Sequence, residues 1–163
     1  MRDVIPNERA CSLAISDSTI DRNQAIGGAN EAGGNGADGR GGGLATHLGG
    51  TIIASNCTVR NNLAVGGAGR PGGYGGNGQG GGLYNDGSTA LGVSSLQVTG
   101  STIIDNDADG GAAGVGKGDG QGLGGGLYLA SGGSVCLDTT TIVKKNHAST
   151  SNDDIFGVFT SCN

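Results

Sequence analysis

Three glycine-rich stretches of equal length constrain the fold of this chain more than any other feature. They cover residues 27–43, 66–82 and 110–126, and each is 17 residues long, begins with GGA and ends with GGG. Together they contain 30 of the 38 glycines among the 163 residues. The rest of the chain then has an ordinary glycine content, near roughly 7%. The sequence therefore reads as a normal scaffold that carries three inserts.

A short motif recurs outside the inserts. It has the form (Ser/Thr/Cys)-Thr-(Ile/Val)-x-x-Asn-x-Ala, and the copies begin at Ser18, Cys57, Ser101 and Thr140. The first three copies each precede an insert, whereas the fourth has one extra residue and no insert behind it. The threonines of the motif are 39, 44 and 39 residues apart, or 22, 27 and 22 without the inserts. A period of this size is typical of one coil of a parallel β-solenoid.

Apolar residues outside the inserts alternate with other residues, which is the pattern of β-strands. Leu96 and Val98 are one example, and helical spacing does not occur. We therefore expect an all-β fold: a single domain over residues 1–163, built as a right-handed parallel β-helix of about four coils with the inserts stacked on one side. The residues expected in its thin core are Leu13, Ile15, Ile20, Leu44, Ile52, Val59, Leu83, Leu96, Val98, Ile103, Leu127, Leu137 and Ile142.

The repeats carry a family resemblance. The combination STIxxNxA and GGGLYN, with the ending TIVKKNHASTSNDDIFGVFTS, resembles the right-handed parallel β-helix repeats of pectin-lyase-like bacterial surface proteins. It is also similar to the repeats of polymorphic outer-membrane autotransporter passengers, with Ile or Val here in place of Phe. The resemblance covers about residues 10–160 and implies a fold more than a function. The shortness, the four cysteines and the uniform inserts depart from that pattern.

Composition narrows the class of protein. The net charge is −5 and the lysines and arginines do not cluster, which disfavours a nucleic-acid partner. There is no 18-residue apolar run, so we expect no membrane insertion. The first ten residues lack the apolar segment of a signal peptide, which indicates either a trimmed chain or another export route. We expect an extracellular or cell-surface location.

The four cysteines have no CxxC spacing, so disulfides are a better interpretation than a zinc site. Cys136 and Cys162 are 26 residues apart, close to one insert-free coil, so they are expected to stack. Cys11 and Cys57 are 46 residues apart, a less regular spacing. Three connectivities stay open, and so does an intermolecular bond from Cys11 to Cys162 of a neighbouring subunit.

Two polar columns are expected to run along the solenoid. The threonines Thr19, Thr58, Thr102 and Thr141 precede an inward residue, so they should form an outward ladder; an ice-binding face is the less favoured alternative. Asn23, Asn62 and Asn106, with Asn146 as a further candidate, are expected to form a stacked amide ladder at a corner, where asparagine tolerates left-handed geometry. Asn56 begins the N-glycosylation pattern Asn-Cys-Thr, although a chance match is favoured there.

Candidate chemistry is sparse. Residues 33–38 resemble the start of a calcium-binding nonapeptide, but Arg40 stands where a large apolar residue belongs. Asp21 and Arg60 should be neighbours on adjacent coils, which is more typical of a surface ion pair than of a catalytic dyad. We therefore expect no enzyme activity, no catalytic residues and no cofactor, with at most weak Ca²⁺ binding.

Two interpretations of the inserts compete: flexible glycine loops, or ordered extended helices of the polyglycine type with three residues per turn. A solenoid of about four coils also exposes strand edges at both ends. The favoured function is a structural protein that self-associates head to tail into a filament or surface layer. The alternatives are an adhesin or glycan-binding module, with glycans or other surface proteins as partners, and an ice-binding protein.

Overall fold

The computed structural model describes residues 11–29, 34–90 and 92–162. Within these ranges every regular element is a β-strand, and the strands pair in parallel in several sheets; one short antiparallel hairpin is the exception. The all-β, parallel character predicted from the alternating residues is confirmed.

The longest sheet of the described chain joins strands from successive repeats. Its order is β1 (Ser12–Ser16), β6 (Thr51–Ser55), β13 (Ser95–Thr99), β18 (Ser134–Leu137) and β22 (Thr160–Ser161). Ser12 pairs with Thr51, Thr51 with Ser95, and Ser95 with Ser134. These offsets equal the repeat spacings of the sequence, so equivalent residues of the repeats lie side by side.

The other parallel sheets follow the same rule. One contains β2 (Thr19–Asp21), β7 (Thr58–Arg60), β14 (Thr102–Ile104) and β19 (Ile142–Lys144). The next contains β3 (Gln24–Ile26), β8 (Leu63–Val65), β15 (Asp107–Asp109) and β20 (His147–Ala148). A third contains β5 (Leu44–Thr46), β10 (Leu83–Asn85), β17 (Leu127–Leu129) and β21 (Ile155–Phe156). The shortest contains β4 (Gly39–Arg40), β9 (Gly78–Gln79) and β16 (Gly122–Leu123).

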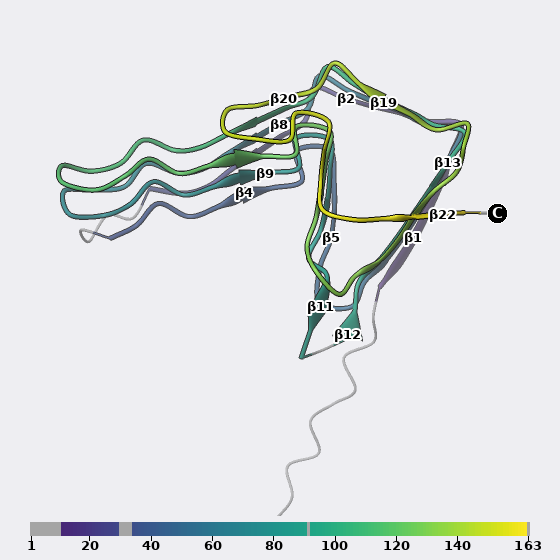
Figure 1. Ribbon diagram of the computed structural model, residues 1–163, viewed down its shortest axis with the longest axis horizontal. Helices are drawn as coiled ribbons and strands as arrows, with labels where there is room; N and C mark the ends of the chain where they lie inside the picture. The colour runs from purple at the N-terminus through teal and green to yellow at the C-terminus, as the bar shows by residue number, and fades with distance from the viewer. Residues whose placement is uncertain (1–10, 30–33, 91, 163) are drawn as a thin grey trace, which may run out of the picture.

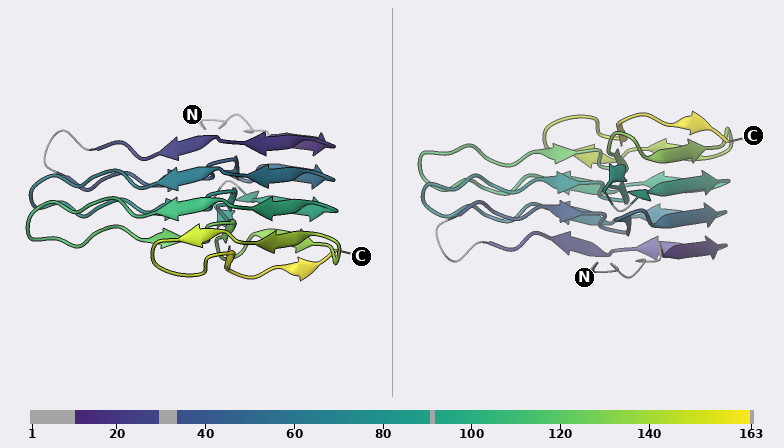
Figure 2. Two further views of the ribbon diagram at one scale, coloured as in Figure 1. Left: turned by 90° about the horizontal axis from the view of Figure 1, so that it is seen from above. Right: turned by 90° about the horizontal axis from the view of Figure 1, so that it is seen from below.

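Seen from one end, the body has a roughly triangular outline, and the glycine-rich segments project from one corner (Figure 1). Seen from the side, the repeats lie in layers (Figure 2). The hairpin formed by β11 (Ser88–Thr89) and β12 (Gly92–Val93) lies between β10 and β13. It accounts for the one repeat spacing of 44 rather than 39, because the extra residues leave the stack there.

The interior is a narrow apolar column. Most residues expected in the core are buried, among them Val59, Leu96 and Leu127, each at most 1% exposed. Ile15 and Leu44 are partly buried against the column. Leu13 faces the same way as Ile52 and Leu96, but it is 44% exposed because no strand of the described chain lies beyond β1.

The expected register of the fourth motif copy was wrong by one residue. Ile142, expected in the core, pairs with Thr102 on the outer face and is 46% exposed. Val143 pairs with Ile103 and packs against the core instead. The extra residue of this copy lies before the strand, so the inward position moves one residue along the chain.

The glycine-rich segments bond to one another through their backbones. The N–H groups of Gly69, Gly72, Gly75 and Gly78 donate to the carbonyls of Ala112, Val115, Gly118 and Gln121, at 2.8–3.2 Å. Both series advance in steps of three residues. A second series alternates between bonds that join the two arms of one segment and bonds that join one segment to the next. Its donors are the N–H groups of Ala37, Gly67, Gly76, Gly111 and Gly120. The approach is so close that a methyl group on Gly120 would overlap the carbonyl oxygen of Gly76.

Candidate functional site

An asparagine ladder runs along one corner of the body. Asn23 donates from its side chain to Asn62 Oδ1 (3.0 Å), Asn62 to Asn106 Oδ1 (2.9 Å), and Asn106 to Asn146 Oδ1 (2.9 Å). Each oxygen also accepts the backbone N–H of the preceding asparagine. Asn62 and Asn106 are fully buried. Because buried amides need partners, this ladder fixes the register of the layers.

The left-handed corner residue is not the asparagine itself. Arg22, Asn61, Asp105 and Lys145, each directly before a ladder asparagine, have φ between 53° and 58°. The expectation that the ladder asparagines adopt this geometry is therefore corrected by one residue. The turn that these residues make aims the next side chain into the body, where the amide meets its neighbours.

The threonine column has three members rather than four. Thr19, Thr58 and Thr102 are paired in register, and Ile142 takes the fourth place. Thr141 instead lies beside Ser101, whose N–H it accepts at 3.4 Å. The column is therefore a ladder of three threonines that ends in an isoleucine.

Asp138 organises the corner at Thr141. Its carboxylate accepts from the Thr140 and Thr141 hydroxyls and from the backbone N–H groups of Gly100 and Thr141. Hydrogen bonds from these two hydroxyls, followed by the backbone donors, lower the pKa of Asp138 to about 2. Asp138 therefore stays charged in moderate acid and holds the corner that contains the extra residue.

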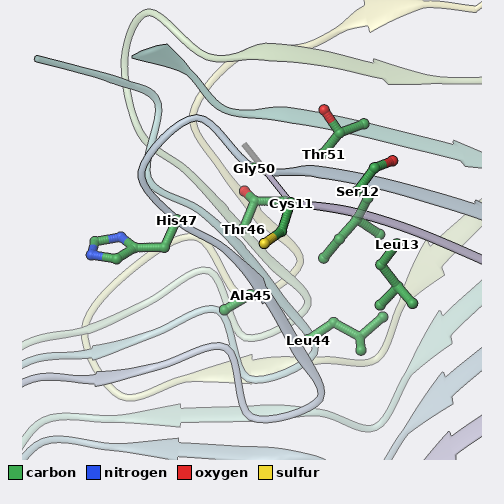
Figure 3. Close-up of a pocket in the computed structure, with 10 residues that line it drawn as sticks. Cys11, Ser12, Leu13, Leu44, Ala45, Thr46, His47, Gly50 and Thr51 are labelled. Atoms are coloured by element: carbon green, nitrogen blue, oxygen red, sulfur yellow. The ribbon is translucent and has the colours of Figure 1, made fainter. Parts of the chain in front are cut away.

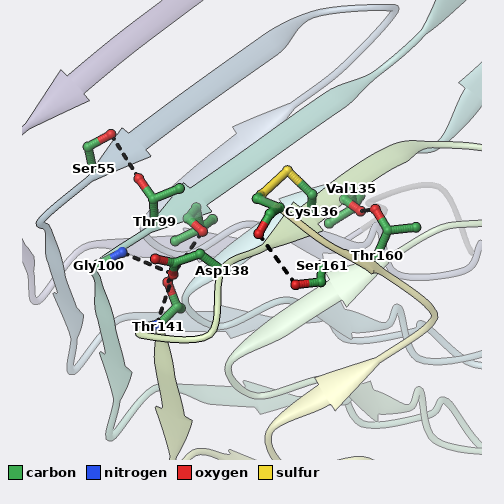
Figure 4. Close-up of a disulfide and its surroundings, with 11 residues drawn as sticks. Ser55, Thr99, Gly100, Val135, Cys136, Asp138, Thr141, Thr160 and Ser161 are labelled. Carbon is green, nitrogen blue, oxygen red and sulfur yellow. Dashed lines mark hydrogen bonds between the residues drawn. A yellow bond between two sulfur atoms is a disulfide. The ribbon is translucent and has the colours of Figure 1, made fainter.

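The cysteines divide into one bonded pair and two free thiols. Cys136 and Cys162 form a disulfide that joins β18 to the C-terminal segment (Figure 4). Cys11 is exposed and Cys57 is buried, and neither is disulfide-bonded. These two are not partners, because Cys11 precedes β1 at one corner whereas Cys57 follows β6 at the next.

The N-terminal end of the described body is open. Leu13, Leu44 and Ile52 line a hollow of about 300 Å³ whose rim includes Cys11 and His47 (Figure 3). Asn23 is exposed at the same end. Asn23 donates to Asn62, and no member of the ladder in the described chain precedes it. This end thus presents apolar side chains and an unfinished ladder.

The C-terminal end is closed by the chain's own polar groups. Asp154 Oδ1 accepts both the side chain and the N–H of Asn146, at 2.9 and 3.1 Å, so a carboxylate replaces the next asparagine. Ser149 and Thr150 accept the N–H groups of Gly110 and Gly122, both at 3.1 Å. Such capping satisfies donors that would otherwise form an exposed edge.

The tip of the glycine-rich segments carries an exposed aromatic residue. Tyr74 is 51% exposed, and the Lys117 ammonium lies 4.8 Å from its ring centroid. Val115 beside them is 85% exposed. The tip lies far from the body (Figure 1), so it presents an aromatic ring and a cation to solvent.

The calcium-like motif is occupied by contacts within the protein. Asp38 of the calcium-like motif is engaged by Arg40 at 2.7 Å and by the N–H of Asn77 at 2.7 Å. Among the described residues no group of three or more His, Cys, Asp or Glu is placed to hold a metal ion.

Asn56, the glycosylation candidate, is exposed at a corner with φ 53°. Asp21 contacts Arg60 at 3.3 Å and Arg22 at 3.1 Å, as a surface ion pair.

Comparison of the chain with protein-family models, with curated proteins and with solved structures finds no match in any of the three. The parallel strands in stacked sheets are compatible with the β-helix resemblance, and the choice of family rests on the sequence motifs alone. In the part of the chain that the structure describes, no helix is long and apolar enough to cross a membrane.

The sequence did not predict two features of the structure. The Asp154 cap had no signal in the repeat, because it comes from the short turn that replaces the fourth insert. The aromatic stack of Tyr84, Tyr128 and Phe156, with ring centroids 5.4 and 4.8 Å apart, was also missed. Its signal was present: the two tyrosines follow the glycine triplets at equivalent positions.

Proposed function

We propose that the chain is a right-handed parallel β-helix of about four coils and that it acts as a structural protein, outside the cell or on its surface, by stacking head to tail. The glycine-rich segments are then a second layer of polyglycine II-like arms beside the coils. The three-residue steps of their hydrogen bonds support this, since that helix has three residues per turn.

The observation that carries the proposal is the match between the two ends. If one copy continues the repeat of another, β2 of the second copy pairs with the outer edge of β19. By the register of the sheet, Val143 then lies beside Ile20, and Lys144 lies beside Asp21. Apolar residues meet apolar residues, and a cation meets an anion.

Head-to-tail stacking along the axis of the coils does not close into a ring, so the product is a filament. The open hollow at Leu13 and Leu44 would be filled by the next copy, which removes apolar surface from water. The function needs neither a bound metal nor a reactive side chain. It assigns the molecule a mechanical role rather than an enzymatic one.

Light scattering and negative-stain microscopy of concentrated protein test the proposal, with and without divalent cations and with and without a thiol reductant. We expect filaments or large assemblies whose formation weakens with the substitution Lys144→Glu, because a carboxylate then faces Asp21. The matched control is Lys117→Glu, which makes the same charge change at the exposed tip of the glycine-rich segments, away from both ends. Monomers only, under all of these conditions, would contradict the proposal.

A second candidate, an adhesin or glycan-binding module, is favoured by the exposed tip. Tyr74 and Lys117 offer the ring face and the cation that sugars with acidic groups recognise. Binding to an array of glycans, lost on the substitution Tyr74→Ala by a protein that stays monomeric, would favour this candidate over the filament. Ice binding remains a third alternative, and thermal hysteresis would reveal it.

A further inference from the structure

The last described residues cross the C-terminal end of the body. After β21, the chain leaves the sheet at Gly157 and runs across the triangular outline to β22 (Figure 1). It passes over the end of the apolar column, and Val158 and Phe159 are 85% and 47% exposed on the way. The segment 157–162 therefore lies on the surface to which the proposed next copy would bind.

β22 occupies the place that β1 of a second copy would take. Thr160 pairs with Cys136, which is equivalent to Gln97, Ile53 and Ala14 in the preceding strands. A second copy that places β2 against β19 must place its β1 against β18, in the same layer. The two strands cannot both be there.

β22 makes few contacts with this edge of β18. It pairs through two residues, whereas β13 pairs with β18 through four and β1 pairs with β6 through five. It also places Ser161 in the inward column that continues from Leu137. β1 would bring Ile15 to that position and Leu13 to the position beside Val135, so the incoming strand offers both more pairing and more apolar contact.

The disulfide keeps β22 in place despite this weakness. Cys162 follows the strand directly and is bonded to Cys136 on β18. The other contacts of the strand are modest, such as the Thr160 hydroxyl that donates to the Val135 carbonyl at 3.1 Å. β22 already belongs to the same chain, and the disulfide further raises its effective concentration at β18, so a strand from a second copy competes poorly while the link is intact.

We propose that the outer edge of β18 is the binding site for β1 of a second copy, and that β22, held by the Cys136–Cys162 disulfide, covers this site until the disulfide is reduced. The inference rests on the proposed head-to-tail stacking and adds its control. Asp154 also covers the end of the stack, at the next corner. Its carboxylate occupies the ladder position that Asn23 of the incoming copy would fill.

Release requires a reductant, and a small dithiol supplies it. One thiolate of the dithiol attacks a sulfur of the protein disulfide, which forms a mixed disulfide and frees the other cysteine. The second thiol of the dithiol then closes a ring and frees the second cysteine. Two electrons pass to the protein, both cysteines end as thiols after proton uptake, and the dithiol leaves as a cyclic disulfide.

The test compares oxidised and reduced full-length protein in a Cys11→Ser background, which prevents intermolecular disulfides through the exposed thiol. Sedimentation and microscopy measure assembly, and circular dichroism verifies that both forms stay folded. We expect the reduced form to assemble at a concentration at least about tenfold lower than the oxidised form. The double variant Cys136→Ser/Cys162→Ser should assemble like the reduced form without any reductant, and adding Ile15→Asp to it should abolish assembly.

The outcomes separate the two proposals. Equal assembly of oxidised and reduced protein would overturn the role of β22 and leave head-to-tail stacking intact. Assembly of the reduced form that tolerates Ile15→Asp would also overturn it, because β1 would then not be the incoming strand. No assembly in any form would overturn both.

Discussion

The body and the glycine-rich segments are stacked in the same layers but held together in different ways. In the body, buried side chains meet along the stack, as in the apolar column and the asparagine ladder. In the segments the contacts are mainly between backbone groups, with a few polar side chains such as Asp38 and Asn77 accepting N–H groups of the next segment. One repeat can therefore combine two kinds of packing. The body needs large buried side chains, whereas the glycine-rich segments need glycine at the positions where backbones come close together.

The largest effect is expected in the ladder, where one side chain serves two layers. Asn106→Ala removes the acceptor of Asn62 and the donor to Asn146 inside the body. Because buried polar groups then lose their partners, we expect a loss of about 4 kcal/mol in the free energy of unfolding. Urea denaturation measures it. Asn23→Ala, at the exposed end, is the control and should cost about 1 kcal/mol; equal losses would show that the ladder is not the main constraint on register.

A somewhat smaller effect is expected in the apolar column. Leu96 is 1% exposed and Leu13, in the same column, is 44% exposed. Leu96→Ala should lower the free energy of unfolding by about 3 kcal/mol, through lost burial and the cavity left behind. Leu13→Ala should cost less than about 1 kcal/mol in the monomer. Thermal or urea denaturation of both variants tests this, and a large cost for Leu13→Ala would mean that the open end is covered.

In the glycine-rich segments, the free energy of unfolding should be lowered by larger side chains rather than by smaller ones. Gly120→Ala forces a methyl group against the Gly76 carbonyl, whereas Gly118 has open space around the same position. We expect Gly120→Ala to cost about 2 kcal/mol, as overpacking does, and Gly118→Ala to be nearly neutral. Hydrogen exchange of the arm N–H groups should also speed up in the first variant. If both variants behave alike, the arms are not packed as described.

The smallest effect concerns acid. The pKa of Asp138 is lowered to about 2, so the carboxylate contributes stability that is complete above its ordinary pKa of about 4 and is lost as the pH falls toward 2. Asp138→Asn should therefore lower the urea midpoint at pH 6. The gap between the variant and the parent should shrink as the pH approaches 2. A gap that is independent of pH would rule out the charged form as the cause.

Much of the body could be predicted from sequence because its signals repeat. The Thr-to-Thr spacing gave the pairing offsets, and the alternation at Leu96 and Val98 gave the inward face. The exceptions are local. The extra residue before Ile142 shifted the inward position to Val143, and a period alone cannot place an insertion. The Asp154 cap depends on the path of a non-repeating turn, which no repeat pattern encodes.

The short turn that replaces a fourth glycine segment has a consequence for the shape of any filament. Each copy would add four strand layers to the axis, or about 19 Å, but only three pairs of arms to its side. The arms of successive copies would be separated by one empty layer. The row of arms along the filament would be interrupted about every 19 Å, and each gap would have the size of one missing pair of arms.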